Sequence, residues 1–142
     1  GETGLDYHYE HSARAIQHIF LKKYLRLAIE CDLPVVFHCR EAFSDLFSMT
    51  DRIGFRAMLH CFTGTAEEAE EVLKRGWMLS FSGIVTFKKS GALRDIAKKA
   101  PLSQILIETD APFLAPQSRR GDINEPSYLL ETAACLAEIK GI

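Results

Sequence analysis

The sequence predicts an α/β fold built on parallel strands, because helical and strand patterns alternate along the chain. Apolar residues at steps of three and four positions mark amphipathic helices, and short β-branched apolar runs between them mark buried strands. These segments recur at intervals of roughly 20–30 residues, which is the spacing of βαβ units. Such units build either an open sheet or a closed barrel, and periodicity alone does not choose between the two.

The first half of the chain supplies three of the expected strands and two of the expected helices. Residues 1–6 have the pattern of the end of a strand followed by a turn. Residues 12–31 carry apolar side chains at helical steps, so they predict an amphipathic helix. Residues 34–39 open with proline and are apolar and β-branched, which predicts a buried strand. A weaker helical pattern over 41–51 precedes a second apolar run over 56–61, where we expect the next strand.

The second half continues the alternation. Thr65 and Glu68 have the spacing of a capping box and predict the start of a helix. Residues 77–84 predict a further strand, and apolar positions over 93–100 form a helical stripe that ends before a proline. The last two expected elements are a strand over 104–110 and a helix over about 126–140.

Length, charge and cysteine content bound the class of protein. The 142 residues suit one domain. Lys and Arg number 17 against 19 Asp and Glu, so the net charge of −2 argues against a surface that binds nucleic acid by charge alone. A nuclease remains open, because a bound cation supplies positive charge locally. The four cysteines are sparse and form no CxxC pair, which favours a reduced cytoplasmic protein. No apolar run reaches the ~20 residues of a membrane span, so we expect no membrane partner.

Three of the expected strands end in a residue that can bind a metal. His38, His60 and Asp110 each close an apolar run, and the carboxyl ends of parallel strands form the active-site face of α/β folds. The two-residue period of a strand puts Glu108 on the same face as Asp110. Glu2 would also lie at a strand tip. Imidazoles and carboxylates without thiolates suit Mg²⁺, Mn²⁺ or Zn²⁺.

Each of these residues also has a purely structural interpretation. A single histidine at a strand end is often only hydrogen-bonded, and an aspartate before Ala-Pro is a common turn former. Arg40 follows the strand of His38 and could reach a phosphate, although a nearby carboxylate is an equal alternative. The basic pairs at 88–89 and 119–120 fit solvated loops, or contacts with an anionic substrate.

Six short motifs occur in order along nearly the whole chain: GETGLD at 1–6, PVVFHCR at 34–40, LHCFTG at 59–64, SFSG at 80–83, IETDAP at 107–112 and RGDINEP at 120–126. Together they resemble the TatD family of metal-dependent deoxyribonucleases. The resemblance implies a (β/α)8 TIM barrel of the amidohydrolase type. It also implies hydrolysis of phosphodiester bonds in DNA, which we expect to proceed as an exonuclease with one or two divalent ions, usually Mg²⁺.

The resemblance also assigns roles to residues of this chain. It implies that Glu2, His38, His60 and Asp110 bind the metal ions. Asp110 would additionally orient or deprotonate the attacking water, and Glu108 would be a second acidic group of the catalytic machinery. Arg40 is our candidate for contact with the DNA substrate.

The family pattern begins with a strand that carries a His-x-His pair, and this chain has no such pair in that setting. A complete barrel needs roughly 250 residues. We therefore expect residues 1–142 to be a partial TatD-type domain with about the last five strand–helix units. Two alternatives stay open: a metal-dependent amidohydrolase or small phosphoester hydrolase, and a catalytically inactive truncated fragment. The oligomeric state is not predicted.

Overall fold

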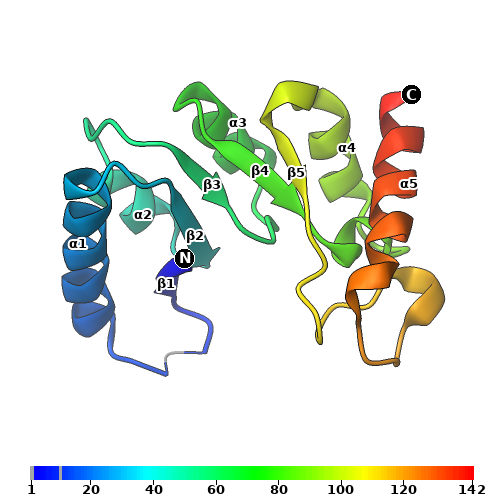
Figure 1. The fold of residues 1–142 in the computed structure, drawn as a ribbon, viewed down its shortest axis with the longest axis horizontal. Coiled ribbons are helices and arrows are strands. Elements are labelled where there is room, and N and C mark those ends of the chain that lie inside the picture. The colour runs from blue at the N-terminus through cyan, green and yellow to red at the C-terminus, as the bar shows by residue number, and fades with distance from the viewer. Residues whose placement is uncertain (1, 10) are drawn as a thin grey trace. The chain divides into compact units, whose positions relative to one another are not determined.

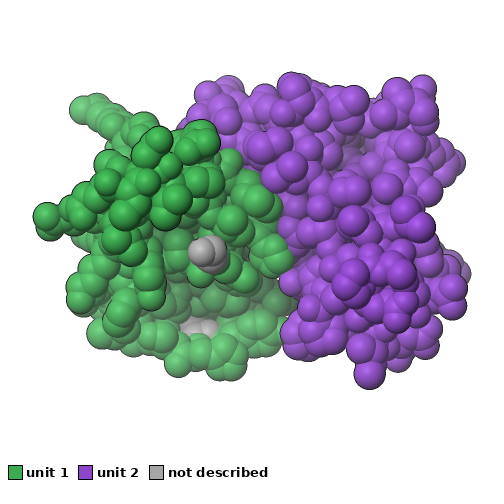
Figure 2. Space-filling model, viewed as in Figure 1, with its two compact units in different colours: residues 1–60 green, residues 61–142 purple. Residues whose placement is uncertain are grey.

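The computed structural model describes residues 2–9 and 11–142, and the chain divides into two compact units, residues 1–60 and 61–142 (Figure 2). Across these described residues, five parallel strands alternate with five α-helices, as the ribbon shows (Figure 1). This alternation confirms the predicted α/β pattern. No helix in the described ranges is both long enough and apolar enough to cross a bilayer.

The first unit contains three parallel strands and two helices. Its elements are β1 (Thr3–Asp6), α1 (Arg14–Glu30), β2 (Val35–Arg40), α2 (Phe43–Met49) and β3 (Ala57–Leu59). β2 is the central strand and pairs with β1 on one side and β3 on the other. Leu5, Phe37 and Leu59 are at most 1% exposed and form the core of these strands. Leu21 and Leu25 of α1 are buried as well, so this helix covers the unit with one apolar face.

The second unit contains two parallel strands and three helices. Its elements are α3 (Ala66–Lys74), β4 (Met78–Phe81), α4 (Gly91–Lys99), β5 (Ile105–Ile107) and α5 (Leu129–Lys140). β4 pairs with β5 in register, with Leu79 opposite Ile105. The predicted capping box is confirmed, because Thr65 accepts a hydrogen bond from the N–H of Glu68 and donates its own N–H to the Glu68 carboxylate.

All five expected strands have different bounds in the structure. The strands expected over 34–39 and 56–61 run over Val35–Arg40 and Ala57–Leu59, so β2 continues past His38 and β3 ends before His60. β1 begins after Glu2 and continues to Asp6, so the prediction that Glu2 closes a strand is wrong. The strand expected over 77–84 ends at Phe81, and a 3₁₀ turn covers Gly83–Thr86. The strand expected over 104–110 ends at Ile107, and Asp110 has a φ of 59° that a strand cannot contain. The apolar runs located these strands, but their ends depend on backbone conformations that periodicity does not encode.

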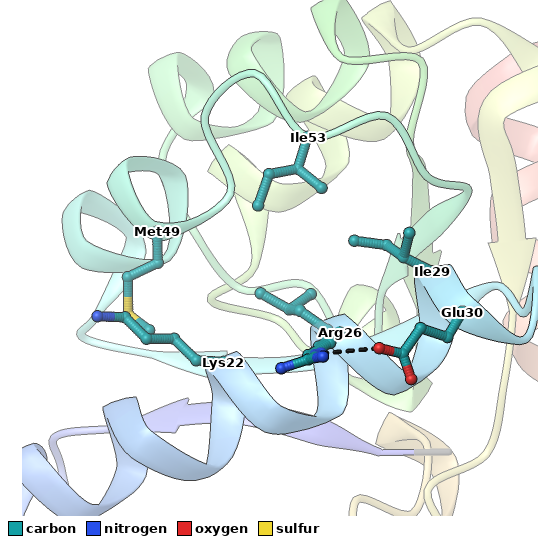
Figure 3. A pocket seen from close by; sticks show the side chains of 7 residues that line it. Lys22, Arg26, Ile29, Glu30, Met49 and Ile53 are labelled. Atoms are coloured by element: carbon teal, nitrogen blue, oxygen red, sulfur yellow. Dashed lines mark hydrogen bonds and ion pairs between the residues drawn. The ribbon is translucent and has the colours of Figure 1, made fainter.

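A pocket of about 310 Å³ opens on the first unit beside α1 (Figure 3). Arg26 and Glu30 form an ion pair of 2.7 Å at its edge. Its lining residues are Lys22, Leu25, Arg26, Ile29, Glu30, Met49 and Ile53. None of the predicted site residues lines this pocket, so the candidate chemistry lies elsewhere.

Candidate metal centre

In the first unit, three predicted ligands lie close together: Glu2, His38 and His60. The Nδ1 atom of His38 lies 3.0 Å from Oε1 of Glu2, and Nε2 of His60 lies 4.0 Å from the same oxygen. His38 projects from β2, where it is in register with Gly4 of β1. A Cβ on Gly4 would lie 1.8 Å from the backbone oxygen of His38, so only glycine permits this close approach of the two strands. The local backbone thus brings Glu2 against the imidazole although Glu2 precedes the strand.

Asp6 is a further residue of this group that sequence reasoning did not single out. Its Oδ2 atom lies 2.9 Å from Nε2 of His38, and its Oδ1 atom accepts hydrogen bonds of 2.9 Å from the N–H groups of His8 and Tyr9. Burial by itself raises the pKa of Asp6, but these backbone hydrogen bonds and the neighbouring imidazole outweigh it, so the pKa lies below its ordinary value. Asp6 therefore favours its carboxylate form and is hydrogen-bonded to the His38 ring.

A usable signal for Asp6 was present in the sequence. Glu2, Gly4 and Asp6 alternate within the first motif, and alternation puts residues of one parity on the same face of a strand. A strand through Asp6, in place of a turn, would have put Asp6 on the same face as Gly4. Gly4 is in register with His38, so this face is the one next to the histidine.

The second unit holds the predicted acidic pair just after β5. Glu108 donates its backbone N–H to the carbonyl of Phe81 at 3.0 Å, which continues the parallel ladder by one residue. Its carboxylate accepts a hydrogen bond from the hydroxyl of Ser80, a residue of β4 that is 1% exposed. Asp110 follows with its left-handed φ of 59°. The two carboxylates each have an oxygen within 4.8 Å of the other, which is close enough for both to bind one cation.

The loop that contains Asp110 is fastened by Asn124, another residue that sequence reasoning missed. The Nδ2 atom of Asn124 donates to the carbonyls of Thr109 at 2.7 Å and Phe113 at 2.5 Å. Its backbone N–H donates to the carbonyl of Pro112 at 3.0 Å, and the residue is only 4% exposed. Asn124 thus bridges the residues on both sides of Asp110. Its place in the RGDINEP motif marked the segment, but no local pattern predicted which carbonyls the amide would reach.

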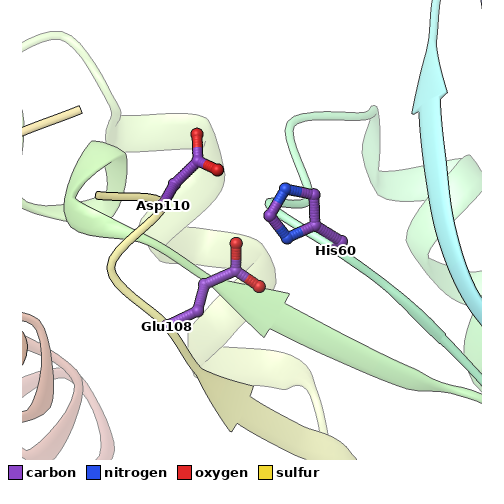
Figure 4. Close-up of side chains that lie close together, drawn as sticks. All are labelled: His60, Glu108 and Asp110. Atoms are coloured by element: carbon purple, nitrogen blue, oxygen red, sulfur yellow. The ribbon is translucent and has the colours of Figure 1, made fainter. Parts of the chain in front are cut away.

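His60 is the last residue before Cys61, where the second unit begins. One candidate ligand atom from each of His60, Glu108 and Asp110 lies within 4.8 Å of the other two (Figure 4). One imidazole nitrogen and two carboxylate oxygens fit Mg²⁺, Mn²⁺ or Zn²⁺, which bind oxygen and nitrogen donors. The donor set therefore suits the divalent cation that the sequence predicts.

Arg40, the predicted substrate contact, is the last residue of β2. Its guanidinium carbon lies 4.8 Å from the centre of the Tyr9 ring, a cation–π geometry. Contact of Arg40 with a phosphate stays a prediction.

Comparison with known proteins identifies the family. All 142 residues match the family model described as TatD-related DNase, so the chain belongs to this family. It is 43% identical to the uncharacterised metal-dependent hydrolase YabD of Bacillus subtilis, over 99% of this chain and 56% of YabD. It is 37% identical to the 3'-5' ssDNA/RNA exonuclease TatD of Enterobacter lignolyticus, over 99% of this chain and 57% of that protein. The chain spans about half the length of the curated relatives it matches.

A solved structure confirms the predicted fold class. The crystal structure of YJJV, a TatD homologue from Escherichia coli K12, matches with a TM-score of 0.90 and 30% identity. The match covers 98% of this chain and 54% of YJJV. The fold is therefore the TIM-barrel type of the TatD proteins, and five of its parallel strands are present in this chain.

Proposed function

We propose that this chain forms part of a metal-dependent phosphodiesterase that shortens single-stranded DNA as an exonuclease. The observation that carries the proposal is the group of His60, Glu108 and Asp110, whose donors suit a divalent cation. The relative from Enterobacter lignolyticus, named a 3'-5' ssDNA/RNA exonuclease, supports the substrate class. The four sparse cysteines support action in the reducing cytoplasm.

The roles of the residues follow from their chemistry. We assign Glu2, His38, His60 and Asp110 as ligands of one or two Mg²⁺ ions, with Mn²⁺ and Zn²⁺ as alternatives. A bound divalent cation lowers the pKa of water and neutralises charge on phosphate oxygens. Asp110 orients the attacking water and accepts its proton, since a carboxylate next to such a water is a suitable general base. Glu108 acts beside it as the second catalytic carboxylate.

Arg40 is assigned to the substrate. Its planar guanidinium can donate two parallel hydrogen bonds to one phosphate group, which a lysine cannot do. The contact with Tyr9 holds the guanidinium at the end of β2, where its N–H groups can donate to a phosphate. This geometry supports a phosphate contact next to His38 on β2.

Asp110→Asn in the full-length protein tests the proposal. Asparagine tolerates the left-handed backbone of this position, so the substitution removes the charge and the proton acceptor without a backbone conflict. With a 5'-labelled single-stranded oligonucleotide and Mg²⁺, we expect the wild type to produce a ladder of shortened products on a gel. The variant should lose at least roughly 100-fold in rate, the usual contribution of a general base. Asp95→Asn, an exposed aspartate of α4, is the matched control and should leave the rate unchanged.

Two results would contradict the proposal. One is a wild type that leaves the oligonucleotide intact while it hydrolyses an amide or a lactone, which would favour an amidohydrolase. The other is an Asp110→Asn variant as active as Asp95→Asn, which would separate the acidic group from catalysis. An RNA oligonucleotide of the same sequence measures the preference for DNA.

A further inference from the structure

Two loops of the second unit are fixed against each other beyond β4 and β5. One loop runs over 83–90 and begins with the 3₁₀ turn Gly83–Thr86. The other runs over 113–122 towards α5 (Figure 1). A Cβ on Gly83 would lie 2.3 Å from the carbonyl oxygen of Leu114, so the loops touch through their backbones. Both loops follow the carboxyl ends of parallel strands, the edge at which Glu108 also lies.

Side-chain hydrogen bonds tie the same two loops together. The backbone N–H of Gln117 donates to Oγ1 of Thr86 at 2.8 Å, and the side-chain oxygen of Gln117 accepts the N–H of Lys88 at 3.1 Å. Arg94 of α4 donates to the carbonyl of Val85 at 3.1 Å and to the carbonyl of Phe87 at 2.7 Å. The loop over 83–90 is therefore held in one backbone conformation from two sides.

These loops display three cations on a fixed surface. The guanidinium carbon of Arg120 lies 4.3 Å from the centre of the Phe87 ring, a cation–π contact. Lys88 and Lys89 follow directly and are exposed. We call Phe87, Lys88, Lys89 and Arg120 the basic platform. Among the residues the structure describes, no carboxylate forms an ion pair with its three cations.

The charged residues next to the platform leave its three cations without a paired carboxylate among the described residues. Arg119 lies beside Arg120 in sequence, but its Nε atom is 3.6 Å from Oε1 of Glu131, so its charge is already compensated. Asp122 is the acidic residue of the segment 116–122, and the segment 83–90 has none. Three uncompensated cations against one carboxylate leave a local positive charge in a chain whose net charge is −2.

We propose that the basic platform binds the phosphate backbone of the nucleic-acid strand whose cleavage is proposed above, on which this inference rests. The Phe87 ring holds the exposed Arg120 guanidinium in place, and its planar set of N–H groups can donate to a phosphate. Lys88 and Lys89 add two point charges for neighbouring phosphates. A cationic surface with an aromatic ring is the usual platform for a single strand.

The test is binding of a fluorescein-labelled oligothymidylate to the full-length protein, followed by fluorescence anisotropy with a chelator present to stop cleavage. For single strands, log K falls with log salt by about 0.7 for each phosphate contacted. The double variant Lys88→Ala/Lys89→Ala should therefore bind more weakly, with a salt slope about 1.4 smaller than that of the wild type. Arg120→Ala should reduce the slope by about 0.7, whereas Arg120→Lys, which keeps the charge, should keep the slope and restore the affinity only in part.

The matched control is Lys98→Ala/Lys99→Ala, which removes the same charge from the opposite end of α4. It should leave affinity and salt slope unchanged, and thermal unfolding of all variants checks that they fold. Hydrolysis of bis(4-nitrophenyl) phosphate by the wild type and by the Lys98→Ala/Lys99→Ala control measures the metal-dependent chemistry without a nucleic-acid strand.

The outcomes separate this inference from the proposed function. If the wild type binds and cleaves the oligonucleotide while the platform variants match the control, the platform proposal is overturned and the nuclease proposal stands. If inorganic phosphate competes as well per phosphate as the oligonucleotide, the platform binds single anions and the strand proposal is overturned. A wild type that cleaves the small diester but neither binds nor cleaves the oligonucleotide overturns both.

Discussion

Replacing Asn124 with alanine removes the amide that fastens the loop around Asp110. The side chain donates two hydrogen bonds, to the carbonyls of Thr109 and Phe113, from a position that is 4% exposed. Each such bond contributes about 0.5–1.5 kcal/mol net, so the loss of two predicts a decrease of about 1–3 kcal/mol in the free energy of unfolding. The affinity for the divalent cation that we propose Asp110 to bind should also decrease, because Asp110 would sample more orientations.

Urea denaturation of the full-length protein, followed by circular dichroism, measures the stability change as a shift of the midpoint at constant slope. Titration with Mn²⁺ or Mg²⁺, followed by calorimetry, measures the change in metal affinity. Asp122→Ala, at an exposed position of the same loop, is the control and should stay within about 0.5 kcal/mol of the wild type. A stability change of Asn124→Ala below about 0.5 kcal/mol, or a reduced stability with wild-type metal affinity, would refute the positioning role.

Three further predictions concern other parts of the chain. Burial and the hydrogen bond to Asp45 raise the pKa of Tyr7 to about 12. The neutral phenol therefore contributes its full stabilisation below the ordinary tyrosine value of 10.0, and this stabilisation decreases as the pH rises towards 12. Absorbance at 295 nm should show one tyrosine that ionises at higher pH than the others, and this step should be absent in Tyr7→Phe. Gly83→Ala should destabilise the protein by about 1–3 kcal/mol, whereas Gly91→Ala, with open space around its Cβ, should be neutral or stabilising in thermal unfolding. Thr65→Ala should cost about 0.5–2 kcal/mol, and a loss within error in urea denaturation would show that the capping box is dispensable.

The order of elements was predictable because burial leaves a periodic signal in the sequence. The strand predicted over 34–39 pairs with a strand on each side and buries Val35 and Phe37, so its sequence is mostly apolar. The helix over 12–31 buries only Leu21 and Leu25 of its central turns, yet its apolar spacing sufficed to locate it. Strand ends were less predictable, because the turn at Gly83 and the loop around Asp110 depend on contacts with residues 31 and 15 positions away in sequence, Gly83 with Leu114 and Thr109 with Asn124.

His38 and His60 could be chosen as candidate ligands because each polar side chain interrupts an apolar run near the end of a predicted strand, and their role as ligands stays a prediction. Residues that hold the ligands were not predictable in this way. Asp6 and Asn124 act through backbone groups, and every backbone carries the same N–H and C=O groups, so the sequence does not identify their partners. Only the folded arrangement shows which carbonyls the Asn124 amide reaches.

Net charge was informative about the whole chain and uninformative about its parts. A total of −2 argued against a basic surface, yet Lys88, Lys89 and Arg120 lie on two loops that hydrogen bonds hold together. Salt screens charges beyond about 8–10 Å, so a strand at the proposed platform would respond mainly to the charges close to these three cations. The relevant quantity for nucleic-acid binding is therefore the charge within one screening length of the strand. For this protein that local charge is positive, and its magnitude is what the salt slope of the platform variants measures.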